Sequence, residues 1–140
     1  MKRAILLAAI VITILAGCSQ ASEEATLTPE AVIDAFRAAG LEAESSVAMS
    51  KDDYGAAPMR DQGALRFLIP SLCADCGGRV LTFDKADDLQ AVKTYYDELG
   101  RSSALFFSWT FAHDNILLQI NGGLAEDKAK LYEAALNGIK

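Results

Sequence analysis

Three cysteines and a single histidine are the residues of this 140-residue chain with the widest range of chemistry. Cys73 and Cys76 are separated by two residues, and that spacer allows the pair to close a small disulfide ring, a bond that persists outside the cytoplasm. The same spacing occurs in thiol–disulfide exchange sites and in zinc sites. The pair is therefore a candidate for a structural disulfide, for free thiols, for a redox site or for a metal site.

The surrounding sequence favours the structural disulfide. A reactive thiolate usually lies at a helix N-terminus, whereas Gly77, Gly78 and a second predicted strand follow Cys76. Zinc needs four ligands, which here would be the two thiols, His113 and an aspartate. His113 lies in the corresponding turn of a second predicted hairpin, so a shared metal site requires both turns at the same end of the sheet.

His113 and Asp114 also have the residue types of an acid–base pair. No serine or cysteine nucleophile stands in a recognisable loop or elbow, however, and hairpin turns commonly carry such polar residues. We therefore predict no catalytic residue, no metal and no enzymatic activity.

Cys18 stands in a different setting. Lys2 and Arg3 precede an apolar run over residues 4–14, which is too short to span a bilayer and is typical of an export signal. The following Leu15-Ala16-Gly17-Cys18 resembles the lipobox of bacterial lipoproteins. The resemblance implies that the Cys18 thiol receives a diacylglyceryl lipid, with acyl chains such as palmitate, and that a peptidase cleaves between Gly17 and Cys18.

This resemblance divides the chain into three parts. Residues 1–17 are the expected lipoprotein signal peptide, residues 18–27 a lipidated cysteine with a polar, flexible tether, and residues 28–140 a single folded domain. Two acyl chains hold a protein stably at a bilayer, whereas one gives only marginal binding. We expect a protein anchored by lipid at the extracytoplasmic face of the cell membrane, in the cell envelope.

Charge narrows the classes of partner. Loss of residues 1–17 removes Lys2 and Arg3 and no acidic residue, so 11 basic and 19 acidic residues remain and the net charge is −8. Nucleic acid repels such a domain, and we expect no nucleic-acid partner. The expected partners are the membrane, through the lipid anchor, and an envelope protein or a small ligand.

The elements that must position these residues are marked by local signals. Thr28-Pro29-Glu30 is typical of a helix start, and Gly40 of its end. Ser50 and Asp53 could cap a single turn in the irregular stretch 41–62. Strands and helices then alternate along the chain, with strands predicted over 65–72, 79–83, 104–111 and 116–120, and helices over 85–99 and from about 125.

These elements predict an α+β domain with a four-stranded antiparallel sheet and helices on one face. Strand 104–111 is apolar on both sides, which favours an interior position, whereas Pro70 favours an edge or a bulge for strand 65–72. The predicted order, in which one helix is followed by two hairpin–helix units, also indicates an internal repeat. A shift of 37 residues aligns strand with strand and helix with helix, and matches Leu81 with Leu118 and Tyr95 with Tyr132.

Most of residues 28–139 resembles small lipoproteins of Gram-positive bacteria, some of them labelled stress proteins. The resemblance implies no activity and no site. The segments that carry it are Arg66-Phe67-Leu68-Ile69-Pro70-Ser71, Tyr95-Tyr96-Asp97-Glu98-Leu99-Gly100, Phe107-Ser108-Trp109 and Gln119-Ile120-Asn121-Gly122.

Two functional hypotheses follow. The first is a membrane-anchored, non-enzymatic binding or interaction module, with its partner surface on the sheet face that helices leave uncovered. The second is a thiol–disulfide redox or metal-handling lipoprotein that uses Cys73 and Cys76.

Overall fold

The computed structural model describes residues 26–140, so the predicted signal peptide, Gly17 and Cys18 lie outside the described residues. The described chain forms one α+β unit, as predicted. Its elements are α1 (Pro29–Ala38), β1 (Glu44–Ala48), α2 (Lys51–Tyr54), β2 (Gly63–Leu68), β3 (Gly77–Thr82), α3 (Ala86–Ser102), the 3₁₀ turn η1 (Ala104–Phe106), β4 (Ser108–His113), β5 (Ile116–Asn121) and α4 (Glu126–Asn137).

The sheet contains five strands rather than four, in the order β1-β2-β3-β5-β4, and every neighbouring pair is antiparallel. The additional strand is β1, which the sequence does not mark. Its residues are mostly polar and exposed, and its pairing with β2 is irregular between Glu44 and Val47, where Ser45 has a positive φ. An exposed edge strand needs no alternating apolar pattern, and for this reason the sequence did not predict β1.

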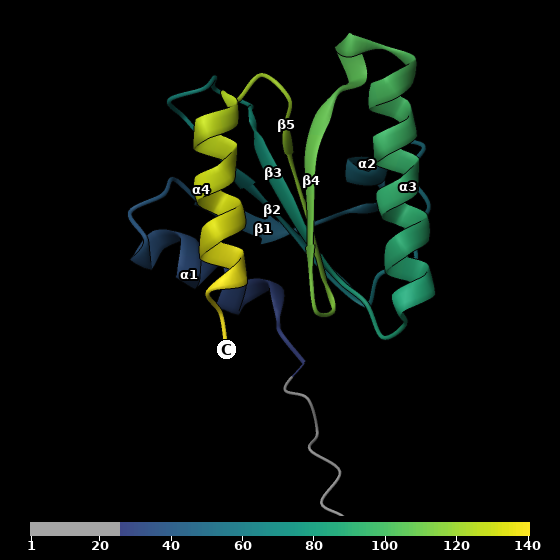
Figure 1. The fold of residues 1–140 in the computed structure, drawn as a ribbon, viewed down its shortest axis with the longest axis horizontal. Coiled ribbons are helices and arrows are strands. Elements are labelled where there is room, and N and C mark those ends of the chain that lie inside the picture. The colour runs from purple at the N-terminus through teal and green to yellow at the C-terminus, as the bar shows by residue number, and fades with distance from the viewer. Residues whose placement is uncertain (1–25) are drawn as a thin grey trace, which may run out of the picture.

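Helices cover both faces of the sheet, and the prediction of helices on one face is wrong (Figure 1). Helices α1 and α4 pack on one face, while α3 and the short α2 lie on the other. Strand β5 shows why: Leu118 and its alternate neighbours belong to the first apolar cluster, and Leu117 belongs to the second. A strand that is apolar at consecutive positions is one buried from both sides.

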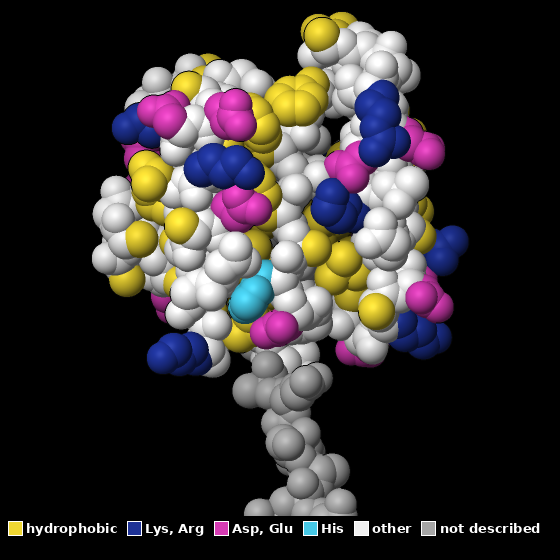
Figure 2. Space-filling view, in the orientation of Figure 1, with side chains coloured by type: hydrophobic (Ala, Val, Ile, Leu, Met, Phe, Trp, Pro, Cys, Tyr) yellow, Lys and Arg dark blue, Asp and Glu magenta, His cyan; other side chains and the backbone are white. Residues whose placement is uncertain are grey.

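The predicted strand positions are also corrected. Strand β4 lies at the sheet edge and β2 lies inside, because Pro70 falls in the turn after β2. The predicted strand over 104–111 begins only at Ser108, and the residues before it form η1. Leu105 is therefore 85% exposed. Figure 2 shows apolar side chains at this end of the molecule, opposite the end at which the chain enters.

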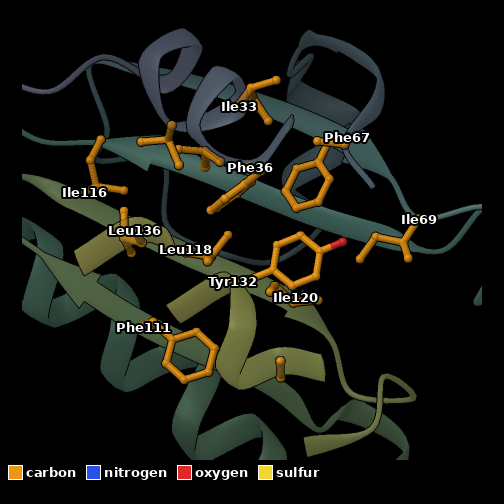
Figure 3. Close-up of a cluster of buried hydrophobic side chains, with 14 of the residues drawn as sticks. Ile33, Phe36, Phe67, Ile69, Phe111, Ile116, Leu118, Ile120, Tyr132 and Leu136 are labelled. Carbon is orange, nitrogen blue, oxygen red and sulfur yellow. The ribbon is translucent and has the colours of Figure 1, made fainter. Parts of the chain in front are cut away.

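The larger core lies between the sheet and helices α1 and α4 (Figure 3). Phe36 from α1 meets Tyr132 from α4 edge-on, with ring centroids 5.1 Å apart, and Phe67 from β2 packs against both rings. Offset and edge-to-face aromatic pairs add about 0.5–1.5 kcal/mol beyond the area that they bury. This cluster joins the N-terminal helix, the C-terminal helix and the sheet.

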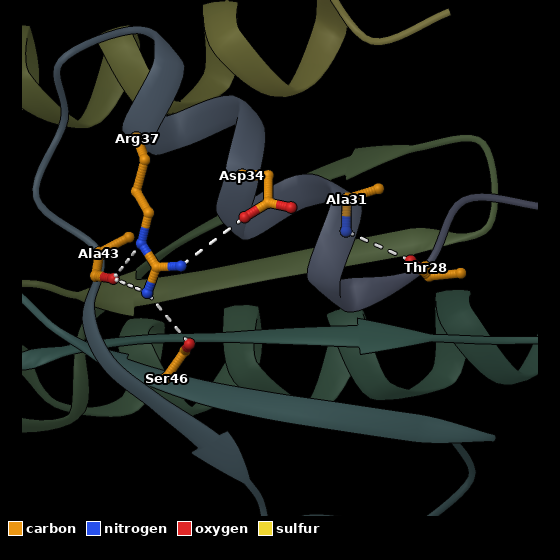
Figure 4. Close-up of polar contacts among 6 residues, drawn as sticks. All are labelled: Thr28, Ala31, Asp34, Arg37, Ala43 and Ser46. Atoms are coloured by element: carbon orange, nitrogen blue, oxygen red, sulfur yellow. Dashed lines mark hydrogen bonds and ion pairs between the residues drawn. The ribbon is translucent and has the colours of Figure 1, made fainter.

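Helix α1 begins and ends as its sequence predicts. Thr28 accepts a hydrogen bond from the Ala31 amide, which satisfies one of the free donors of the first turn. At the other end the Arg37 guanidinium donates to the Ala43 carbonyl at 2.8 and 3.1 Å and to Ser46 at 3.2 Å (Figure 4). Arg37 thereby connects the end of α1 to β1.

The two hairpin turns lie at opposite ends of the sheet. Because β3 and β5 are antiparallel, Gly78 at the start of β3 faces Ile120, and Thr82 at its end faces Ile116. A hairpin followed by a helix does occur twice along the chain. Helices α3 and α4, however, pack on opposite faces of the sheet. A rotation that places one hairpin on the other therefore does not place α3 on α4. The internal repeat stays a prediction.

Candidate functional site

One end of the domain receives the chain, and the β4–β5 turn holds it there. The Asn115 amide accepts from the Leu27 backbone N–H and donates to the Leu27 carbonyl, both at 2.9 Å. Asn115 also donates to Thr82, whose hydroxyl donates in turn to Leu27. We call this the tether end, because the tether predicted over residues 18–27 precedes the segment held here.

His113 and Asp114 lie at the tether end. Their side chains are 3.5 Å apart, and the buried His113 Nε2 has no hydrogen-bond partner. Asp114 has a φ of 48°, a left-handed conformation that aspartate adopts in turns. His113 therefore ends β4, and Asp114 with Asn115 forms the hairpin turn. The absence of a catalytic role for the pair stays a prediction.

Cys73 and Cys76 lie at the opposite end, which we call the distal end. The two cysteines are joined by a disulfide within the β2–β3 turn. The shared metal site of these thiols with His113 is not formed, because the turns occupy opposite ends of the sheet. In residues 26–140 no group of three or more histidine, cysteine and acidic side chains is placed to hold a metal.

The residue after the disulfide begins a strand rather than a helix. A Cβ atom at Gly77 would lie 1.8 Å from the Phe67 carbonyl oxygen, so β2 and β3 approach too closely there for any side chain. The helix N-terminus that usually lowers a thiol pKa does not follow Cys76. Thiol–disulfide exchange at Cys73 and Cys76 stays a prediction.

Beside this turn, on the face that carries α2 and α3, a polar row crosses four strands. Arg66 on β2 faces Arg79 on β3, Arg79 faces Gln119 on β5, and Gln119 faces Thr110 on β4. The first three residues line a hollow of about 240 Å³, whose floor includes Gly77. We call it the distal hollow.

Each arginine of the distal hollow has a different partner. Arg66 forms an ion pair with Asp53 of α2 at 3.3 Å. Hydrogen bonds from the backbone and side chain of Ser50, together with Arg66, lower the pKa of Asp53. Arg79 is half-buried and donates to the neutral Gln119 Oε1 at 3.1 Å. Within residues 26–140, no carboxylate lies within 4.0 Å of the Arg79 guanidinium.

Helix α3 packs against β4 and β5 and is attached to β4 by a charged network. The Asp97 carboxylate accepts from Lys93 at 2.8 Å and from the Thr110 hydroxyl at 2.5 Å. Partial burial would raise the pKa of Asp97, but these hydrogen bonds outweigh burial and lower it. The network holds the polar row against α3.

Two buried hydroxyls at this end have no hydrogen-bond partner. The hydroxyls of Tyr96 on α3 and Ser108 on β4 are both unpaired, and both residues line a second hollow beside the C-terminal part of α3. Burial raises the pKa of Tyr96, and the nearby Arg79 guanidinium offsets part of the rise. Unpaired buried polar groups are rare in folded proteins, and they often mark functional positions.

The distal end also carries the exposed apolar side chains of the α3–β4 connection. Leu105 is 85% exposed, Phe106 54% and Phe107 40%. The apolar residues of the predicted strand 104–111 are therefore divided: Phe111 and Trp109 pack against the larger core, whereas Phe107 lies at the surface. The sheet face that was predicted to be uncovered, with a partner surface on it, carries helices instead.

Sequence reasoning missed Arg66, Arg79 and Gln119 as a group. Each stands in a strand among apolar neighbours, and that local signal was present in the chain. Only the pairing of three strands places them side by side, and the register was not predictable from one sequence.

Comparison with family models, curated proteins and solved structures finds no match to this chain. Within the described residues, no helix is both long and apolar enough to cross a membrane.

Proposed function

We propose that this protein is a bacterial lipoprotein, anchored at the extracytoplasmic face of the membrane through a diacylglyceryl group on Cys18. Its domain is a non-enzymatic binding module whose ligand site is the distal hollow. One observation carries the proposal: the chain enters the domain at the tether end, and the hollow lies at the other end of the sheet. Such an arrangement presents the site to the envelope rather than to the lipid surface.

The spacing along the chain supports this arrangement. Leu27, held by Asn115, comes nine residues after Cys18. A flexible linker of that length has an average span of roughly 5–6 Å multiplied by the square root of the residue number, or about 16 Å. The domain is thus kept near the membrane while it keeps freedom to turn its distal end outward.

The chemistry of the distal hollow supports binding rather than catalysis. Its polar groups are two guanidiniums, two side-chain amides and the carboxylates of Asp53 and Asp75. No serine, cysteine or histidine is among the residues that line it. The guanidiniums and amides that do line it are suited to hold a polar ligand through hydrogen bonds.

The anchor is tested by intact-mass spectrometry of the full-length chain isolated from the membrane fraction of a bacterial host. We expect a species that begins at Cys18 and carries the added mass of a diacylglyceryl group. Cys18→Ser should lose this mass and the incorporation of labelled palmitate. The double variant Cys73→Ser/Cys76→Ser, with both other thiols removed, should keep both. An unmodified wild-type chain, or label retained in Cys18→Ser, would overturn the proposed anchor.

A further inference from the structure

The distal hollow brings together four side chains that present hydrogen-bond donors. Arg66, Arg79, Gln119 and Asn121 come from β2, β3 and β5 and line the same space. Guanidinium groups have donors and no acceptor. The carboxylates of Asp53 and Asp75, which also line the hollow, only accept, so the orientation of the two amides decides how many donors the hollow offers beyond the arginines.

Both amides turn their nitrogen atoms away from their protein partners. Gln119 meets Arg79, and because a guanidinium only donates, the facing atom is Oε1, at 3.1 Å. Asn121 accepts from the Gly123 backbone N–H through Oδ1 at 2.8 Å. Each amide oxygen is thus occupied by the protein, and each NH₂ group is left to donate elsewhere. The complementary ligand is one rich in acceptors.

The two arginines add a charge argument. Arg66 and Arg79 stand directly opposite each other on antiparallel strands, and like charges in that position destabilise a sheet. Asp53, which also lines the hollow, forms an ion pair with Arg66 and attracts Arg79 from a longer distance. The hydrogen bond of Arg79 in the described chain goes to the neutral Gln119. A negative group between the two arginines would offset the remaining repulsion and use donors on both strands.

We propose that the distal hollow is an oxyanion site, which takes the carboxylate or phosphate group of a small ligand between Arg79 and Arg66 with the Gln119 amide as a further donor. The inference rests on the proposed binding function and specifies the class of its ligand. Asp75 stands at the rim in the disulfide-closed turn. It disfavours a large polyanion, because a second negative group outside the donor cluster would approach its carboxylate.

The size of the hollow agrees with a small ligand. Its volume of about 240 Å³ lies below the roughly 300–1,000 Å³ of pockets that hold drug-sized molecules. A single carboxylate or phosphate with a short carbon skeleton has the appropriate dimensions.

The test uses the ¹⁵N-labelled, full-length lipidated protein in a neutral detergent. Sodium phosphate and sodium succinate are titrated separately, at pH 7.5 and at constant ionic strength set with sodium chloride. We expect saturable changes in the side-chain NH signals of Arg79, Gln119 and Asn121 with at least one of the two anions. The anion that saturates these signals at the lower concentration identifies phosphate or carboxylate as the group that the hollow binds in its ligand.

Two matched pairs of variants test the assignment. Arg79→Gln should weaken binding at least tenfold, while Arg60→Gln, which removes the same charge from an exposed ion pair with Asp88, should leave it unchanged. Gln119→Glu places a carboxylate beside Arg79 and should abolish binding without unfolding the sheet. Gln90→Glu, on the exposed side of α3, makes the same charge change and should have no effect.

The oxyanion site is overturned if neither anion gives a saturable change, or if Arg79→Gln and Gln119→Glu bind as the wild type does. The Gln119→Glu variant keeps Arg79 and still offers it a hydrogen-bond partner. It therefore tests the oxyanion site even if Arg79→Gln fails to fold. The binding measurement on purified protein does not depend on how the chain is anchored, and the mass measurement on Cys18 does not depend on any ligand. Failure of the oxyanion site is therefore distinguishable from failure of the proposed lipoprotein anchor.

Discussion

Two buried tyrosines differ in what their hydroxyls meet. Tyr132 is 3% exposed and donates to the Glu42 carbonyl at 2.7 Å, and burial raises its pKa to about 12. Tyr96 is 6% exposed and its hydroxyl has no partner. Leaving a buried polar group unpaired costs about 1–3 kcal/mol, whereas a satisfied one contributes about 1 kcal/mol.

The substitution of phenylalanine at these two positions should have opposite effects on the free energy of unfolding. Tyr96→Phe should raise it by about 1 kcal/mol, because an unpaired hydroxyl is removed, and Tyr132→Phe should lower it by a similar amount. Urea denaturation of both variants measures the difference. A loss of stability in Tyr96→Phe as large as that in Tyr132→Phe would mean that the Tyr96 hydroxyl does have a partner in solution.

The lowered pKa of Asp97 leads us to expect that the stability of the domain depends on pH. Its pKa is lower in the folded protein than in the unfolded chain, because Lys93 and Thr110 donate to the carboxylate and outweigh its partial burial. Its contribution to stability is therefore complete above the unfolded value of about 3.9 and is lost as the pH falls through the lower folded value.

We expect Asp97→Asn to reduce the free energy of unfolding by about 1–2 kcal/mol at pH 7. The difference from wild type should shrink as the pH falls from about 4 through the lower pKa of the folded protein, at which the Asp97 carboxylate of the folded wild type is protonated. The control is Asp34→Asn, whose carboxylate is 78% exposed and 3.7 Å from Arg37, and which should change little at either pH. Thermal unfolding across pH 3–7 tests this, and a constant difference at all pH values would contradict it.

At the scale of elements, the sheet depends on a glycine that allows β2 and β3 to approach. A Cβ atom at Gly77 would clash with the Phe67 carbonyl, a backbone atom that cannot rotate away. Gly77→Ala should therefore destabilise the domain by about 3 kcal/mol or more. Gly63→Ala is the matched control at the other end of the hairpin, because its Cβ atom would meet only Thr82 at 3.6 Å. Equal midpoints of denaturation for the two variants would show that the strands are not so close.

The elements also show what a single sequence predicts well. The start of α1 at Thr28 and the single turn α2 between Ser50 and Asp53 were both indicated by capping residues, which act through hydrogen bonds within four positions of the chain. Strand β1 was not, since its side chains are exposed. Residues 104–107 were predicted as strand because apolar residues usually are buried, and here they form an exposed turn.

At the scale of the molecule, the tether end and the distal end lie at the first and last residues of α3, whose 17 residues span about 25 Å. A fluorophore on Lys85→Cys marks the tether end, and one on Leu105→Cys marks the distal end. In vesicles that contain a quencher on their lipids, the lipidated protein should be quenched more strongly at position 85 than at position 105. Equal quenching would contradict the outward presentation of the distal hollow.

The sequence alone determined the features that arise from neighbouring residues. These are the α+β class, the helix boundaries set by caps, the close pair Cys73 and Cys76, and the lipobox-like segment that ends at Cys18. Each depends on side chains a few positions apart, where the geometry of the backbone leaves few alternatives.

Only the tertiary structure decided which faces the helices cover and which residues meet at the distal hollow. Periodicity shows that a helix has an apolar side, but not against which face of a sheet that side packs. The register of β2, β3 and β5 places Arg66, Arg79 and Gln119 in one row, although 53 positions separate the first from the last. The same pairing places His113 and Cys76 at opposite ends, because antiparallel strands reverse direction at every hairpin.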